Sequence, residues 1–149
     1  LIRPPDSRYK ARGAFSLSDL VSGGENHADG RWVGFHGQPM IVSAHFDRAQ
    51  RVDSVGISVK QVYGAHIYPP QQIEIWGGPD SAASQLLSSV RPALEMPDKA
   101  AAGRVINVPV KGGAVRYLRI VAEPFVPIPA KYPAEGNPAW IFVDEIIMN

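Results

Sequence analysis

The 149-residue chain contains no cysteine, which excludes disulfides, thiolate chemistry and zinc sites with cysteine ligands. It also lacks any apolar run approaching the roughly 20 residues that a transmembrane helix requires. The start of the chain has neither an initiator methionine nor the apolar segment of a signal peptide. We therefore expect no transmembrane segment, and we interpret the chain as a segment from the C-terminal end of a larger protein.

An excess of charge of one sign is missing as well. Fifteen lysines and arginines against 14 aspartates and glutamates give a formal net charge of +1, and no basic run compensates locally. This balance argues against nucleic acid as a partner. Catalytic patterns are equally scarce, because the chain has no Gly-x-Ser-x-Gly motif, no glycine-rich phosphate loop and no metal-ligand spacing among its four histidines. We expect no catalytic residue, and we assign any catalysis to another domain of the parent protein.

What the chain does contain is a series of short alternating runs separated by Gly, Pro, Asn and Asp. Its composition, 45% apolar and 19% charged, is typical of a globular domain with a core. The one brief patch of period 3.6 lies near residues 81–90, so the pattern indicates a nearly all-β chain. We predict one antiparallel β-sandwich domain over residues 1–149. The expected strands are 14–18, 40–46, 52–62, 72–76, 104–110, 115–123 and 140–148.

The last of these expected strands carries two adjacent carboxylates, Asp144 and Glu145, in an otherwise apolar run. Alternation along a strand predicts that they point to opposite faces. A carboxylate on the core face needs an arginine, backbone amides or a bound cation, because an unpaired buried charge is very costly.

Several motifs in a fixed order resemble a known family. They are Leu-Ser-Asp at 17–19, Asp-Gly-Arg-Trp-Val-Gly-Phe at 29–35, Ile-Tyr-Pro-Pro at 67–70, Arg-Tyr-Leu-Arg-Ile at 116–120 and Trp-Ile-Phe-Val-Asp-Glu-Ile at 140–146. Together they resemble the discoidin domain, also called the coagulation factor 5/8 type C or galactose-binding-like domain. Within that group the chain is most similar to bacterial modules appended to glycoside hydrolases such as β-N-acetylhexosaminidases.

This resemblance implies a jelly roll of about eight strands and a noncatalytic function. The implied function is a carbohydrate-binding module that holds a secreted, extracellular or periplasmic glycan-active enzyme near galactose-type or N-acetylhexosamine-type glycans. The alternative is a structural or protein-interaction module that packs against the parent catalytic domain and binds no sugar. A histidine beside an exposed aromatic favours the first hypothesis, and an apolar surface centred on residues 67–70 favours the second.

The resemblance also implies a structural calcium ion, held between the loop after the first strand and a glutamate in the last strand. Asp19 and Glu145 fall at the matching positions, and Ser22 adds an oxygen, the ligand type that calcium prefers. Leu20 stands where relatives usually have glycine, and a leucine resists a positive φ. In the alternative arrangement Asp19 caps the turn, and Glu145 pairs with Arg116 or Arg119.

Sugar recognition needs an aromatic surface and a few rigid polar groups in loops at one end of the sandwich. The candidate sugar-binding residues are His36, His66, Trp32, Tyr68, Arg91 and Tyr132. For Trp32 a second interpretation is open, in which its ring closes the end of the core. Trp76 and Trp140 lie inside apolar runs and are expected to be core residues.

Overall fold

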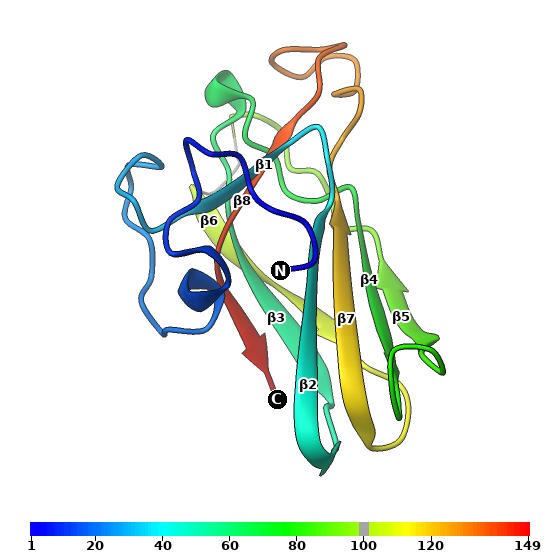
Figure 1. Ribbon diagram of the computed structural model, residues 1–149. Coiled ribbons are helices and arrows are strands. Elements are labelled where there is room, and N and C mark those ends of the chain that lie inside the picture. The colour runs from blue at the N-terminus through cyan, green and yellow to red at the C-terminus, as the bar shows by residue number, and fades with distance from the viewer. Residues whose placement is uncertain (99–101) are drawn as a thin grey trace.

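The computed structural model describes residues 1–98 and 102–149, and these residues form eight strands in two antiparallel sheets (Figure 1). The first sheet has the order β1-β8-β3-β6, with β1 at Val33–His36, β8 at Trp140–Met148, β3 at Ser54–Lys60 and β6 at Gly103–Pro109. The second has the order β2-β7-β4-β5, with β2 at Met40–Gln50, β7 at Val115–Glu123, β4 at Gln72–Gly78 and β5 at Gln85–Val90. The predicted all-β sandwich is confirmed.

The core lies between the two sheets and is built by alternation along the strands. Ile57 of β3 faces inward from the first sheet, and Ile120 of β7 faces inward from the second; both are buried. In β2, alternation puts one face inward, because Met40 is buried in this core and Val42, Ala44 and Phe46 pack against it. Each fully buried aliphatic side chain stabilises such a core by about 1.5–3 kcal/mol.

Three local expectations are wrong. The expected strand at 14–18 is a 3-10 helix, η1 at Gly13–Leu17, which begins at a glycine with φ +64°. The patch near 81–90, whose period suggested a helix, contains the edge strand β5 instead, and its side chains are exposed or half-buried, so it has no buried apolar face to reveal the strand. Finally, β1 was expected to be loop, because four residues are too few to show an alternating pattern.

The last strand contains a β-bulge at its two carboxylates. Ser58 of β3 lies opposite Glu145, while the next residue, Val59, lies opposite Val143, so Asp144 is an extra residue in β8. The bulge resets the alternation, and Val143 and Ile146 both reach the core. The expectation that the two carboxylates lie on opposite faces is therefore wrong, since both turn to the same N-terminal loop.

The segments before β1 lie beside the first sheet, where Leu17 of η1 reaches the core, and the long connections gather at one end of the sandwich (Figure 1). The N-terminal segment is joined to β1 by two backbone bonds, from the Asp6 amide to the Gly34 carbonyl (2.9 Å) and from the Gly34 amide to the Tyr9 carbonyl (2.7 Å). A second 3-10 helix, η2 at Tyr63–Ala65, and the 124–139 connection lie together at the loop end. Aromatic residues of these loops are thereby brought to the ends of β1 and β8.

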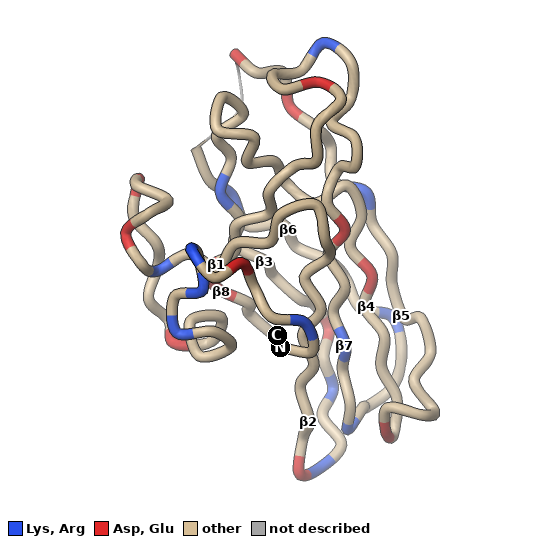
Figure 2. The backbone as a smooth tube through the Cα atoms, turned by 45° about the horizontal axis from the view of Figure 1, so that its top comes forward, with Lys and Arg blue, Asp and Glu red and all other residues tan. Residues whose placement is uncertain are grey.

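Charges of both signs are spread along the backbone without a large region of one sign (Figure 2). Among the described residues, no helix has the length and apolar character needed to span a bilayer.

Candidate functional site

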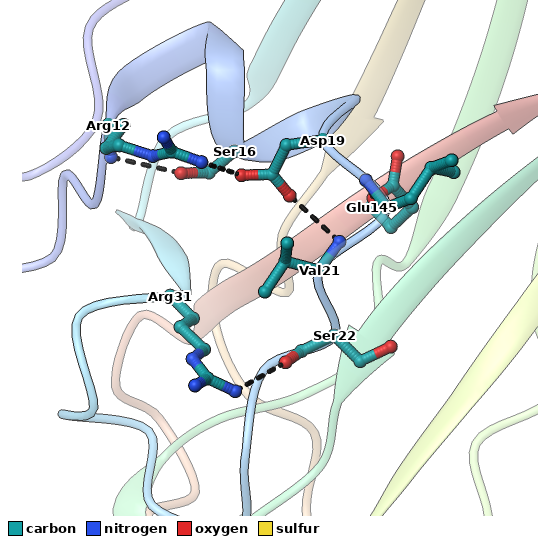
Figure 3. Close-up of polar contacts among 8 residues, drawn as sticks. Arg12, Ser16, Asp19, Val21, Ser22, Arg31 and Glu145 are labelled. Carbon is teal, nitrogen blue, oxygen red and sulfur yellow. Dashed lines mark hydrogen bonds and ion pairs between the residues drawn. The ribbon is translucent and has the colours of Figure 1, made fainter.

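The candidate calcium region joins the loop after η1 to the bulge of β8 (Figure 3). Asp19 accepts a hydrogen bond from the Arg12 guanidinium at 2.5 Å through one carboxylate oxygen. Its other oxygen accepts the amide of Val21 at 3.0 Å, which closes a turn. The hydrogen bond from Arg12 holds the pKa of Asp19 below its usual value.

Glu145 reaches the same loop through the backbone. Its carboxylate accepts the amide of Leu20 at 2.8 Å. Leu20 adopts φ +58° although it is a leucine, and its side chain is 87% exposed, so the left-handed conformation places the side chain in solvent. Burial raises the pKa of Glu145, and the hydrogen bond from Leu20 opposes that rise.

The alternative partners of Glu145 belong to the other sheet. Arg116 donates to the carbonyl of Asp47 at 3.2 Å, and the guanidinium of Arg119 lies 5.2 Å from the centre of the Trp76 ring. Pairing of Glu145 with Arg116 or Arg119 is therefore wrong. The need of a buried carboxylate is met by a backbone amide, one of the three options that the sequence left open.

Two of the three residues proposed for calcium have an oxygen engaged by an arginine. Besides the Arg12 contact to Asp19, the carbonyl of Ser22 accepts from the Arg31 guanidinium at 3.3 Å. Across residues 1–98 and 102–149, no group of three or more histidine, aspartate or glutamate side chains is placed to hold a metal ion. Asp19, Ser22 and Glu145 could hold a calcium ion only if Arg12 moved away from Asp19. Calcium binding at this place stays a prediction.

A second candidate region lies at the loop end, around Trp140. The imidazole of His36 stacks on the Trp140 indole with ring centres 4.4 Å apart and planes at 15°. The guanidinium of Arg8 lies 5.1 Å from the centre of the same indole. The amide of Trp140 donates to the carbonyl of His66 at 2.8 Å, so the backbone of the second candidate histidine also adjoins this residue.

Trp140 and Trp76 were expected in the core, and this expectation is wrong for both, because each side chain is half-buried at the surface. Trp140 lies on the first sheet and Trp76 on the second. The neighbour of Trp140, Ile141, and then Val143 point into the core, so alternation along the strand points Trp140 outward. This alternation is visible in the sequence and could have predicted the outward position of Trp140. Arg8 carried no signal, because only the fold of the N-terminal segment brings it to the indole.

The remaining sugar-binding candidates lie elsewhere. Tyr68 is 0% exposed, stacks on Tyr63 with centres 4.3 Å apart, and donates to the carbonyl of Pro133 at 2.6 Å. Burial raises the pKa of Tyr68 to about 12. Tyr132 is half-buried and packs against this pair. The Tyr68 ring thus has no exposed surface on which a sugar can stack.

Trp32 is also buried, and its indole N–H donates to the carbonyl of Gly24 at 3.1 Å. Trp32 is thus not an exposed platform, but it packs with Ile67 and Phe142 in a separate cluster and does not close the end of the main core. Arg91 is exposed directly after β5. The structure therefore places the His36 imidazole on Trp140, joins His66 to Trp140 through the backbone alone, and leaves Trp32 and Tyr68 buried.

The two-sheet arrangement matches solved structures of carbohydrate-binding modules. GH31 CBM32-2 bound to GalNAc gives a TM-score of 0.59 at 12% identity, over 97% of this chain and 93% of the other. The CBM32 of AlyQ in complex with 4,5-unsaturated mannuronic acid gives 0.56 at 13% identity, over 96% and 90%.

The chain has the CBM32 fold. The C-terminal domain of a chitobiase from Bacteroides fragilis is also similar, with a TM-score of 0.50 at 13% identity over 87% of this chain and 76% of that one. The resemblance drawn from the sequence is confirmed at the level of the fold. CBM32 modules are noncatalytic as a family. Comparison with family models and with curated proteins gives no match to the sequence.

Proposed function

We propose that this domain is a noncatalytic carbohydrate-binding module whose ligand contacts the His36–Trp140 pair. The observation that carries the proposal is a histidine stacked on a half-buried tryptophan at the loop end of a CBM32 fold. An indole offers an apolar surface to the C–H face of a pyranose, while imidazole and guanidinium groups donate to its hydroxyls. Arg8 supplies the guanidinium beside the same ring.

The ligands of similar modules support a ligand class for this proposal. Those modules are solved with GalNAc, with 4,5-unsaturated mannuronic acid and, in CpGH89 CBM32-5 from Clostridium perfringens, with GalNAc-β-1,3-galactose. We propose a galactose-type or N-acetylhexosamine-type glycan here. Attached to a glycan-active enzyme outside the cytoplasm, such a module raises the effective concentration of substrate by tethering.

A structural or protein-interaction function is the second candidate. Its expected apolar surface at residues 67–70 does not exist, because all four residues are buried. A different observation supports it: Phe15 is 72% exposed and Leu20 is 87% exposed, and both lie in the N-terminal region at the first sheet. Apolar side chains this exposed are suited to docking against a parent catalytic domain.

The test is a glycan array at high protein loading, with calcium present and again after chelation, followed by titration of any hit. We expect binding to one glycan class, and we expect Trp140→Ala to lose it. Trp76→Ala is the matched control, because Trp76 is half-buried on the other sheet. If no glycan binds on the array or in titration, sugar binding is overturned and the docking function takes its place.

A further inference from the structure

A cavity of about 360 Å³ lies on the outer side of the first sheet, away from Trp140. It is formed by the loop at Ser22, Gly23 and Gly24, the end of β3, the start of β6 and the bulge of β8. Its volume is at the lower end of the range of about 300–1,000 Å³ that is usual for small-molecule sites. Its polar wall is unusual, because two charged side chains in it are almost fully buried.

The first of these side chains is Lys60, at the end of β3. Lys60 is 3% exposed, its ammonium donates to the carbonyl of Gly24 at 3.0 Å, and it lies 5.0 Å from the centre of the Trp32 ring. In the described part of the chain no carboxylate forms an ion pair with it. An ammonium has three donors, so this group brings unused hydrogen-bonding capacity to the cavity.

The second is Asp144, the bulged residue of β8. Asp144 is 2% exposed, and its Oδ2 accepts the amide of Gly23 at 2.6 Å. Its Oδ1 is buried and has no hydrogen-bond partner. A buried carboxylate oxygen without a donor is costly, and native proteins rarely retain one without a ligand, ion or water to satisfy it.

These two groups define the chemistry of an occupant. An anion would lie against Asp144 and Glu25, and a cation would lie against Lys60 and Arg104, so neither single charge suits the wall. A neutral molecule with adjacent hydroxyls meets both needs, since one hydroxyl donates to Asp144 Oδ1 and a neighbouring one accepts from Lys60 Nζ. Hydrogen bonds to ionised groups are the stronger kind.

We propose that this cavity binds one neutral pyranose residue through Lys60 and Asp144. The proposal rests on the proposed glycan-binding function, but it adds a sugar contact separate from the His36–Trp140 pair. Ser22 and Ser58 also line the cavity and supply further hydroxyls. Trp32 helps to fix the position of Lys60 in the cavity wall, because the Trp32 N–H and the Lys60 ammonium both donate to the carbonyl of Gly24.

The indole N–H signals of the three tryptophans can report ligand binding separately at three places in the molecule. The indole N–H of Trp32 reports on the cavity, that of Trp140 on the loop end, and that of Trp76, which donates to Glu74 at 3.0 Å, on the opposite sheet. We would titrate ¹⁵N-labelled protein with galactose and with N-acetylgalactosamine. The indole signals would be assigned from Trp→Phe variants.

We expect the Trp32 signal to move saturably with one of these sugars while Trp76 stays still. Asp144→Asn keeps an oxygen for the Gly23 amide but replaces the free acceptor by a donor, so we expect the affinity at Trp32 to fall at least about tenfold. Lys60→Met, which keeps the aliphatic stem, is the second variant and serves alone if Asp144→Asn does not fold.

The outcomes separate the two proposals. A signal shift confined to Trp140 overturns the cavity site and leaves the glycan-binding function standing. So does a Trp32 shift with the same affinity in the wild type and in folded Asp144→Asn or Lys60→Met. No saturable shift of either Trp32 or Trp140, together with an array that shows no binding, overturns both.

Discussion

The amide of Leu20 and the carboxylate of Glu145, 125 residues apart in sequence, form a 2.8 Å hydrogen bond that ties the N-terminal loop to the last strand. Three residues along, the amide of Gly23 bonds the carboxylate of Asp144 at 2.6 Å. Two adjacent carboxylates of one bulge thus hold two amides of one loop. The bulge is the feature that allows it, because regular alternation would turn one carboxylate away.

The Glu145 carboxylate gives the first prediction, on the pH dependence of stability. Burial raises its pKa above 4.5 in the folded state, so the folded state binds the proton more tightly than the unfolded chain. Its contribution to the free energy of unfolding therefore falls as pH rises from about 4.5 through the folded pKa. Glu145→Gln keeps an acceptor for Leu20 without the charge, and we expect it to be at least as stable as the wild type at pH 7.

Urea denaturation between pH 4 and pH 8 checks this expectation. The difference between wild type and Glu145→Gln should grow in favour of the variant as pH rises through that window. A variant that is clearly less stable at pH 7 would show that the ionised carboxylate is needed, as it would be with a bound cation.

Arg12 gives the second prediction, on calcium. Because its guanidinium already neutralises Asp19, we expect the wild-type melting temperature to be the same in calcium and in chelator. Arg12→Met frees the Asp19 carboxylate, so we expect a slightly lower melting temperature that calcium partly restores. Arg51→Met is the control, since Arg51 forms a similar exposed pair with Asp53 at 2.7 Å.

Differential scanning calorimetry with and without calcium measures both effects. A wild type that melts higher in calcium would contradict the expectation and support an ion between Asp19 and Glu145. Calcium stabilisation of Arg51→Met equal to that of Arg12→Met would show a nonspecific effect.

Long alternating segments made most of the fold predictable from the sequence. The strands β7 at Val115–Glu123 and β8 at Trp140–Met148 have the expected bounds, and β2 begins at the expected Met40. The pattern failed where it was short or half-exposed, at β1 and β5. It also failed at the bulge, because an extra residue in a strand changes parity without changing composition.

The candidate site was less predictable, because it depends on tertiary contacts. His36 and His66 were identified as polar residues in loops, and the fold stacks the His36 ring on Trp140 while His66 meets Trp140 only through its backbone carbonyl. Lys60 and Asp144 were missed as cavity residues. A lysine that ends a strand is normally solvated, and only the 22–24 loop folded over Lys60 makes it a buried donor.

Gly23 gives the third prediction, on packing beneath this loop. A Cβ at Gly23 would lie 2.2 Å from Cε2 of the Trp32 indole, a rigid ring that is itself buried. We expect Gly23→Ala to lower the free energy of unfolding by about 1–3 kcal/mol, as overpacking does. Gly64→Ala is the control, because a Cβ there meets nothing within 4 Å. Equal stability of the two variants in chemical denaturation would contradict the close approach.

The buried Tyr68 gives the fourth prediction, at the loop end. Tyr68→Phe removes the hydroxyl that donates to the carbonyl of Pro133 at 2.6 Å but keeps the stack on Tyr63. We expect a loss of about 0.5–1.5 kcal/mol in the free energy of unfolding. Tyr132→Phe is the control and should lose less, because the Tyr132 hydroxyl makes a longer contact of 3.5 Å to Leu94.

The same hydroxyl should be visible in an alkaline titration. Burial raises the pKa of Tyr68 from 10.0 to about 12, so the folded protein keeps this proton while the unfolded chain loses it. Stability should therefore fall as pH rises from 10 to about 12, and less so in Tyr68→Phe. Tyrosinate absorbance of the folded protein should show a phase near pH 12 that the variant lacks. Ionisation of every tyrosine near pH 10 would mean that the ring is reached by water and that the loop end is open rather than packed.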